Sequence, residues 1–215
     1  MNNFFSNSYY KEIELNIFNF LNKNLDLIPK NILNSPRSIW DKIEEIIRNN
    51  IENIIIWIKD YQWEFERRAM ADLAFWDENW NFYVIDVKTH NLETEFNMPN
   101  LISVQRISKF YRNDNSFFVI LKVDYSISKW LIINKVEFTA IEHIDRSCLT
   151  LWALWWWQIQ ISNANIVRIN RQQNKKDRML FLCNKMIDSF YPNEIYKISD
   201  RIEYFRVEKS FWLEK

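Results

Sequence analysis

The stretch MADLAFWDENWNFYVIDVKTHN, residues 70–91, decides the fold predicted for this chain. It contains two short runs with β-strand character, residues 70–75 and 82–88. The connection between them, residues 76–81, is polar and rich in turn-forming side chains. This pattern predicts a β-hairpin.

Three charged side chains of this hairpin are expected to converge. Asp86 and Lys88 lie two residues apart, so in a strand they emerge on the same face, and Asp72 can lie across from them. Two carboxylates attract a hard divalent cation, and a neighbouring ammonium can orient water or stabilise an anionic transition state. A solvent-facing hairpin with a simple salt bridge is the alternative. Against it, Ile85 and Val87 flank Asp86, which favours a strand inside a sheet, where an unpaired charge needs a partner such as a metal ion.

Composition sets broad limits. The chain has 215 residues with 48% hydrophobic and 26% charged content, which predicts a single domain, residues 1–215, with a full core. The formal net charge is zero, so any nucleic-acid binding must come from local clusters. Two cysteines without metal-ligand spacing and the absence of a signal-peptide pattern predict a cytoplasmic protein, and no apolar run is long enough to predict a membrane span.

The sequence contains no glycine and eleven tryptophans. Trp80 follows Asn79 in the hairpin connection, a position that usually needs a positive φ. We hypothesise that many tryptophans are UGA codons that the source organism translates as glycine. The alternatives are a protein truly rich in tryptophan, or a host that uses UGA for tryptophan. If the hypothesis holds, the structure of the literal sequence should show strain near such sites.

Apolar spacing predicts helices over residues 8–25, over residues 38–57 with Ser38 as N-cap, over residues 100–111 with Asn100 as candidate N-cap, and over residues 177–190, ending near Pro192. The apolar segment 116–125 predicts a central strand.

Candidate nucleic-acid contacts follow later in the chain. Gln158 and Gln160 alternate with apolar residues, so one strand face would carry both amides, which can donate to and accept from an adenine edge; an exposed strand face is the alternative. The most basic segment, IVRINRQQNKKDR, includes Lys175 and Lys176 and suits phosphate contacts, or is a polar loop before the last helix.

The spacing D-x13-D-x-K resembles that of the PD-(D/E)XK nuclease superfamily. The segment 86–108, DVKTHNLETEFNMPNLISVQRIS, is similar to the HincII-type type II restriction endonucleases, which have DVKT-x-N, a short loop and P-N-[LI]-I-S. The later WQIQ falls where that family has a small-residue run followed by Q-I-Q. Departures are Ala71 in place of proline and tryptophans in place of glycines at Trp40 and in the triplet 155–157.

The resemblance implies a role for each matching residue. Asp72 and Asp86 would bind Mg²⁺ with the carbonyl of Val87, and Lys88 would position the attacking water. The helix before the hairpin would add an acidic residue, Glu44 in preference to Glu45. The DNA-contacting residues that it implies are Asn97, at a position that wedges into the base stack, Asn100 near the bases, and Gln158 and Gln160 on the base-contacting strand.

We therefore expect a restriction-endonuclease-like α/β fold, with a mixed central β-sheet flanked by helices. The expected function is that of a homodimeric, Mg²⁺-dependent type II endonuclease acting on double-stranded DNA. By resemblance its target would be a GTYRAC-like palindrome cut to blunt ends. The alternatives are a repair or junction nuclease of the same fold and a non-catalytic DNA-binding domain.

Overall fold

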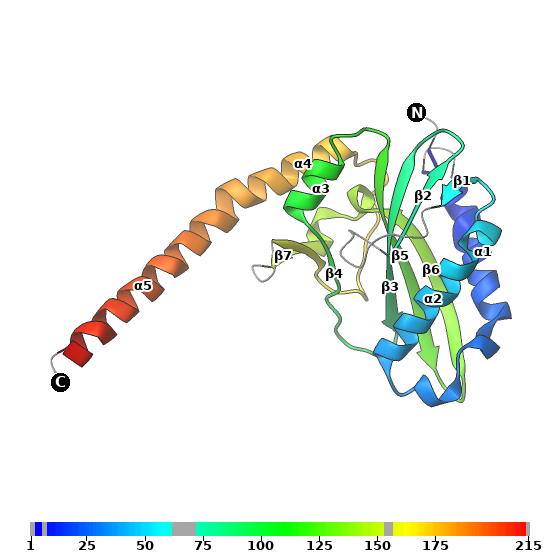
Figure 1. Ribbon diagram of the computed structural model, residues 1–215, viewed down its shortest axis with the longest axis horizontal. Helices are drawn as coiled ribbons and strands as arrows, with labels where there is room; N and C mark the ends of the chain where they lie inside the picture. Colours follow the sequence, from blue (N-terminus) through cyan, green and yellow to red (C-terminus); the bar gives the residue numbers. More distant parts are fainter. Residues whose placement is uncertain (1–2, 6–7, 62–71, 153–156, 214–215) are drawn as a thin grey trace. The chain divides into compact units, whose positions relative to one another are not determined.

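A computed structural model describes residues 3–5, 8–61, 72–152 and 157–213 (Figure 1). The chain divides into two compact units, Met1–Gln172 and Gln173–Lys215, and each is described by itself. No helix in the described ranges is both long enough and apolar enough to cross a membrane.

The first unit is built around a five-stranded sheet of order β1-β2-β3-β5-β6. Its strands are β1 (Ile58–Tyr61), β2 (Leu73–Asp77), β3 (Phe82–Asn91), β5 (Ser116–Ile127) and β6 (Leu131–Ala140). β3 and β5 are parallel and the other neighbours are antiparallel, so the sheet is mixed. The predicted α/β class with a mixed sheet flanked by helices is confirmed, as is the interior position of the segment 116–125.

Two helices supply most of the apolar cover of this sheet. They are α1 (Tyr9–Lys23) and α2 (Pro36–Ile54), with short 3-10 turns at Leu25–Leu27 and Lys30–Ile32 between them. Figure 1 shows both helices beside the sheet. The predicted N-cap of the second helix was wrong: the Ser35 hydroxyl accepts from the Ser38 backbone N–H at 3.3 Å, since Pro36 begins the helix and needs no N–H partner.

Strand alternation sorts the side chains of β3 between two faces. Tyr83, Ile85 and Val87 are fully buried in one core with α1 and α2. The intervening positions, which include Asp86 and Lys88, therefore emerge on the opposite face. The fold thus places the charged side chains of β3 on the face turned away from that core.

A second sheet has three strands in the order β4-β8-β7. Its strands are β4 (Asn100–Ser103), β7 (Leu149–Trp152) and β8 (Gln158–Ile161); α3 (Val104–Phe110) follows β4, and 3-10 turns cover Ile141–His143 and Arg146–Cys148. After β8, the next α-helix along the chain is the first helix of the second unit. The predicted helix over residues 100–111 was wrong in its first turn. Asn100 pairs with Gln160 across the sheet, and the Ser103 hydroxyl caps α3 by accepting from Arg106 N at 3.2 Å.

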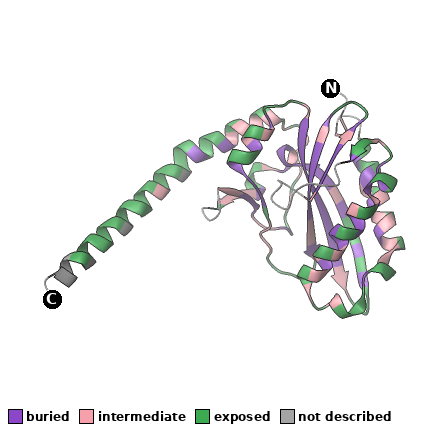
Figure 2. Ribbon diagram, in the orientation of Figure 1, coloured by how far each residue is buried: buried purple, intermediate pink, exposed green. Residues whose placement is uncertain are grey.

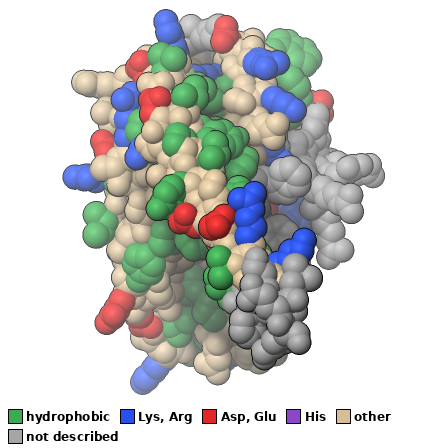
Figure 3. All heavy atoms as spheres, turned by 90° about the vertical axis from the view of Figure 1, so that its left-hand side faces the viewer, with side chains coloured by type: hydrophobic (Ala, Val, Ile, Leu, Met, Phe, Trp, Pro, Cys, Tyr) green, Lys and Arg blue, Asp and Glu red, His purple; other side chains and the backbone are tan. Residues whose placement is uncertain are grey.

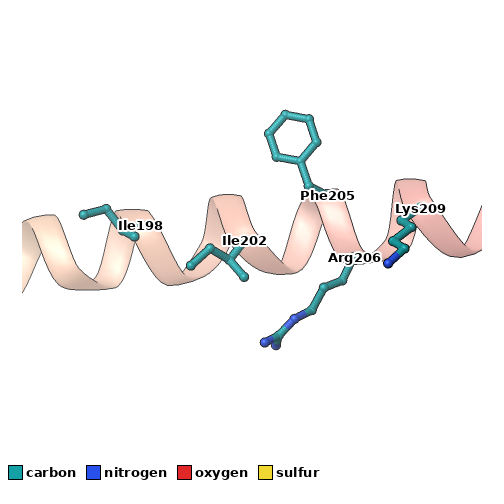
Figure 4. A pocket seen from close by; sticks show the side chains of 5 residues that line it. All are labelled: Ile198, Ile202, Phe205, Arg206 and Lys209. Atoms are coloured by element: carbon teal, nitrogen blue, oxygen red, sulfur yellow. The ribbon is translucent and has the colours of Figure 1, made fainter.

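The second unit is helical from Lys175 to Leu213. α4 (Lys175–Asn184) passes through a π-helical segment, Lys185–Phe190, into α5 (Tyr191–Leu213). The predicted stop near Pro192 was wrong. Proline lacks an N–H and crowds the preceding turn, and here the wider π-helical turn comes immediately before it. Most of α5 is exposed (Figure 2), including the apolar side chains Ile198, Ile202 and Phe205 drawn in Figure 4.

Backbone geometry bears on the missing glycines. Among the described residues, positive φ occurs only at Ser8, Trp80 and Trp157, with φ of 62°, 59° and 60°. The left-handed region is unfavourable for any residue with a Cβ and favours glycine. The positive φ predicted for Trp80 is confirmed, and Trp157 shares it. The other members of the tryptophan triplet, residues 155 and 156, lie outside the described residues.

Candidate active site beside strands β2 and β3

The candidate site lies beside β3, at the start of the described part of the hairpin. Asp72 N donates to Ile85 O at 2.9 Å, one residue before β2 begins at Leu73. The Val87 N–H donates to the Asp72 carboxylate, Oδ2, at 2.7 Å. Asp72 is thereby fixed beside the residue that links Asp86 to Lys88.

Asp86 and Lys88 form the second half of the site. The Lys88 ammonium donates to Asp86 Oδ1 at 2.7 Å. Asp86 is only 6% exposed, and its other oxygen, Oδ2, has no hydrogen-bond partner among the described residues. A buried carboxylate oxygen without a donor is costly, and a bound cation is one way to satisfy it.

The electrostatics of the two carboxylates are coupled. Burial raises the pKa of Asp86 to about 6; the Lys88 ammonium opposes this rise and the Asp72 carboxylate adds to it. Burial also raises the pKa of Asp72, against the Val87 N–H and the charges of Lys88 and Arg48. Both carboxyls are therefore short of compensating positive charge. A divalent cation would supply it.

One row of side chains on α2 faces this site, at positions 40, 44 and 48. The Trp40 indole N–H donates to the Val87 carbonyl at 2.9 Å. Glu44 is buried and forms an ion pair with Arg48, whose charge lowers the pKa of Asp72. Glu45 points outward and pairs with Lys42 at 3.0 Å. Glu44, which the sequence analysis preferred to Glu45, is thus the buried one of the two. Its connection to Asp72 is indirect, through its ion pair with Arg48.

Sequence reasoning missed Arg48. Its signal was the spacing, since residues four apart share a helix face and Arg48 lies four residues after Glu44. Arg48 thus supplies a positive charge from the helix to the first carboxylate of the hairpin.

A separate buried network lies further along β3. His90 Nδ1 is 3.0 Å from Asp124 Oδ1, and the Lys122 ammonium lies 2.8 Å from the same oxygen and 3.6 Å from Glu137. Lys122 is the β5 neighbour of Lys88 in the parallel register. Because Lys122 already has two carboxylate partners of its own, Lys88 is the lysine of this pair that serves Asp86.

The residues present suit a hard cation with oxygen ligands. Asp72 accepts from the Val87 N–H, and Asp86 is close enough to Asp72 for the two carboxyls to shift each other's pKa. Carboxylate and carbonyl oxygens are the ligands that Mg²⁺ prefers. In the described part of the chain, no group of three or more His, Cys, Asp and Glu side chains is arranged around a metal position. A cation here would therefore take two side-chain ligands, a backbone ligand and water, as Mg²⁺ commonly does.

The candidate DNA contacts are divided between the two units. Gln160 is buried and donates through Nε2 to Asn100 Oδ1 at 2.5 Å, while Gln158 pairs with Ser103 in the same sheet. The carbonyl of Asn97 accepts from Ala164 N at 2.8 Å, which holds its loop near the end of β8. These four residues are thus brought together around the second sheet. Lys175 and Lys176 begin α4 in the other unit.

The surface carries no continuous basic area on the face drawn in Figure 3, as far as the described residues show. Acidic, basic and apolar side chains are mixed there. This agrees with a formal net charge of zero. Attraction of a polyanion would depend on local clusters.

Comparison with known proteins assigns no family. No family model matches this sequence, and no curated protein is significantly similar to it. The functional proposal therefore depends on the contacts of the site itself.

Proposed function

We propose that this chain is a Mg²⁺-dependent endonuclease of the PD-(D/E)XK type, acting on double-stranded DNA as a homodimeric type II restriction enzyme. The observation that carries the proposal is the closeness of Asp72, Asp86 and Lys88 beside β3: Asp72 accepts from the Val87 N–H, Lys88 donates to Asp86, and both Asp72 and Lys88 act on the pKa of Asp86. The resemblance of the sequence around Asp86 to the HincII-type enzymes supports it further. Both lines of support concern the same short stretch of chain.

Each residue of the site has a chemical task in this proposal. Asp72 and Asp86 would hold the cation together with the Val87 carbonyl. When bound, Mg²⁺ would supply an activated water and neutralise charge on the phosphate. Lys88, held against Asp86 at 2.7 Å, would orient the attacking water and stabilise the developing negative charge. The products would carry a 5′-phosphate.

The second sheet is the proposed base-reading element. Asn100 is exposed at the start of β4, and its side chain is oriented by the buried Gln160. Gln158 lies two residues before Gln160 on β8, and Asn97 lies in the loop that leads into β4. Two copies related by a two-fold axis would cut both strands of a palindrome, with a GTYRAC-like hexamer as the first target to test.

The test is incubation of purified protein with phage DNA and Mg²⁺. Discrete bands support sequence-specific cleavage, whereas cleavage of branched or damaged DNA alone would indicate a repair or junction nuclease. Asp86→Asn and Lys88→Met should each lower the cleavage rate by at least about 100-fold. The matched control is Asp60→Asn on the exposed β1, which should cleave like the unchanged protein. Undiminished cleavage by Asp86→Asn would refute the assigned chemistry.

A further inference from the structure

Trp40 makes a hydrogen bond to the backbone oxygen that a cation in the candidate site would need. Its indole N–H donates to the Val87 carbonyl at 2.9 Å. Indole nitrogen is a donor only, so the contact directs a positively polarised hydrogen at that oxygen. On its other side the ring lies under the Arg37 guanidinium, 4.1 Å from the ring centre.

The Val87 carbonyl and its N–H face the same edge of β3, because both groups of one residue point to one side of a strand. The N–H donates to Asp72 Oδ2 at 2.7 Å, so the carbonyl points to the same edge of β3 as this contact. Asp86 is close enough to Asp72 for the two carboxyls to shift each other's pKa, and its Oδ2 is the only buried carboxylate oxygen without a hydrogen-bond partner that the described residues show. Two carboxyls and a backbone carbonyl are thus neighbours, and the carbonyl already accepts from Trp40.

We infer that Trp40 competes with a divalent cation for the Val87 carbonyl, so that residue 40 sets the cation affinity of this site. A carbonyl oxygen has two lone pairs, but a positively polarised N–H hydrogen on one of them repels a cation on the other and draws electron density from the oxygen. The indole contact would therefore weaken cation binding at this oxygen. A smaller residue at position 40, such as the glycine that the UGA hypothesis places there, would leave the carbonyl open.

This inference rests on the proposed function, and Mn²⁺ binding in the absence of DNA tests the two separately. Mn²⁺ prefers the same oxygen ligands as Mg²⁺, and the electron paramagnetic resonance signal of the free ion reports how much is bound. Trp40→Gly removes the ring, and Trp40→Phe keeps an aromatic helix residue without the N–H. Trp130→Phe, at an exposed tryptophan in the β5–β6 connection, is the matched control.

Loss of one competing hydrogen bond should tighten Mn²⁺ binding by about fivefold. Tighter binding by either folded Trp40 variant, with Trp130→Phe unchanged, supports the inference. Unchanged affinity in both variants overturns it, as does equal tightening in the control. The proposed function fails by a different result: no Mn²⁺ bound by any of these proteins, or binding that survives Asp86→Asn. Far-ultraviolet circular dichroism establishes that each variant is folded.

Discussion

Trp80 and Trp130 form a natural pair for testing whether the left-handed turn stores strain. Each side chain is 56% exposed, and each ring lies 3.8 Å from a lysine ammonium, that of Lys59 or Lys30. The backbones differ, because Trp80 has a φ of 59° and Trp130 does not have a positive φ. Replacing each by glycine removes a cation–π contact from two different conformations, and at Trp80 it also removes a T-shaped contact with the Trp76 ring, whose centroid lies 6.3 Å away.

The magnitudes follow from this difference. Loss of an exposed cation–π contact costs about 0.5–1 kcal/mol at either site. The added freedom of glycine in the unfolded chain costs about a further 0.5–1 kcal/mol. Only at Trp80 does glycine relieve a left-handed conformation, which is worth about 1–2 kcal/mol. Loss of the exposed ring contact with Trp76 offsets about 0.5 kcal/mol of this gain. Trp80→Gly should therefore be more stable than Trp130→Gly by about 0.5–1.5 kcal/mol.

Urea unfolding followed by circular dichroism measures both free energies without relying on tryptophan fluorescence. A Trp80→Gly protein as unstable as Trp130→Gly, or less stable, would show that the turn carries no strain that glycine can relieve. It would also remove the structural support for glycine at position 80. Peptide mass spectrometry of the native protein addresses the UGA hypothesis directly.

Three further predictions test the first unit. Because the pKa of Asp86 rises from 3.8 to about 6 on folding, the metal-free protein should lose about 3 kcal/mol of stability as pH rises through 4 to 6. Urea unfolding in EDTA should show this fall, and Asp86→Asn should reduce it, leaving the part that comes from the raised pKa of Asp72. Ser103→Ala should cost about 1 kcal/mol in the same assay by removing the α3 cap, and an unchanged free energy of unfolding would show that Ser103 does not cap α3. Asp77→Ala should lower the free energy of unfolding by at least about 3 kcal/mol, because it leaves buried hydrogen-bond donors in the hairpin turn without an acceptor. A loss below about 1 kcal/mol would contradict that reasoning.

The sequence was most informative where the pattern of apolar residues was simple. Alternation around Asp86 supported a strand with every second residue on one face. The unbroken apolar run 116–125 predicted an interior strand, because such a strand is covered on both faces. The apolar stretch after Pro99 has no such alternation. Its first residues satisfy their backbone in a second sheet that forms only when β8, nearly sixty residues later, pairs with it.

Other features were beyond local reasoning for similar causes. Pro192 normally ends a helix, and the π-helical segment that precedes it here has no sequence signal. Arg48 resembled any solvated residue of α2 until the fold brought it near Asp72. The contact between Trp40 and Val87 joins residues 47 positions apart, so no motif could have predicted it.

The Asp77 carboxylate stabilises the turn of the hairpin through several hydrogen bonds. It accepts from the backbone N–H groups of Asn79 and Asn81, from the Asn81 amide and from the Tyr83 hydroxyl, at 2.9 to 3.1 Å. Going back along β2 from Asp77, Leu73 is paired with Ile85, and Asp72 is the residue before Leu73. The number of residues between Asp72 and Asp77 is therefore constrained in evolution. Inserting or deleting one residue there would move the Asp72 carboxylate to the face of the sheet that α1 and α2 cover. Inserting or deleting two residues would keep it on the same face and displace it along the strand.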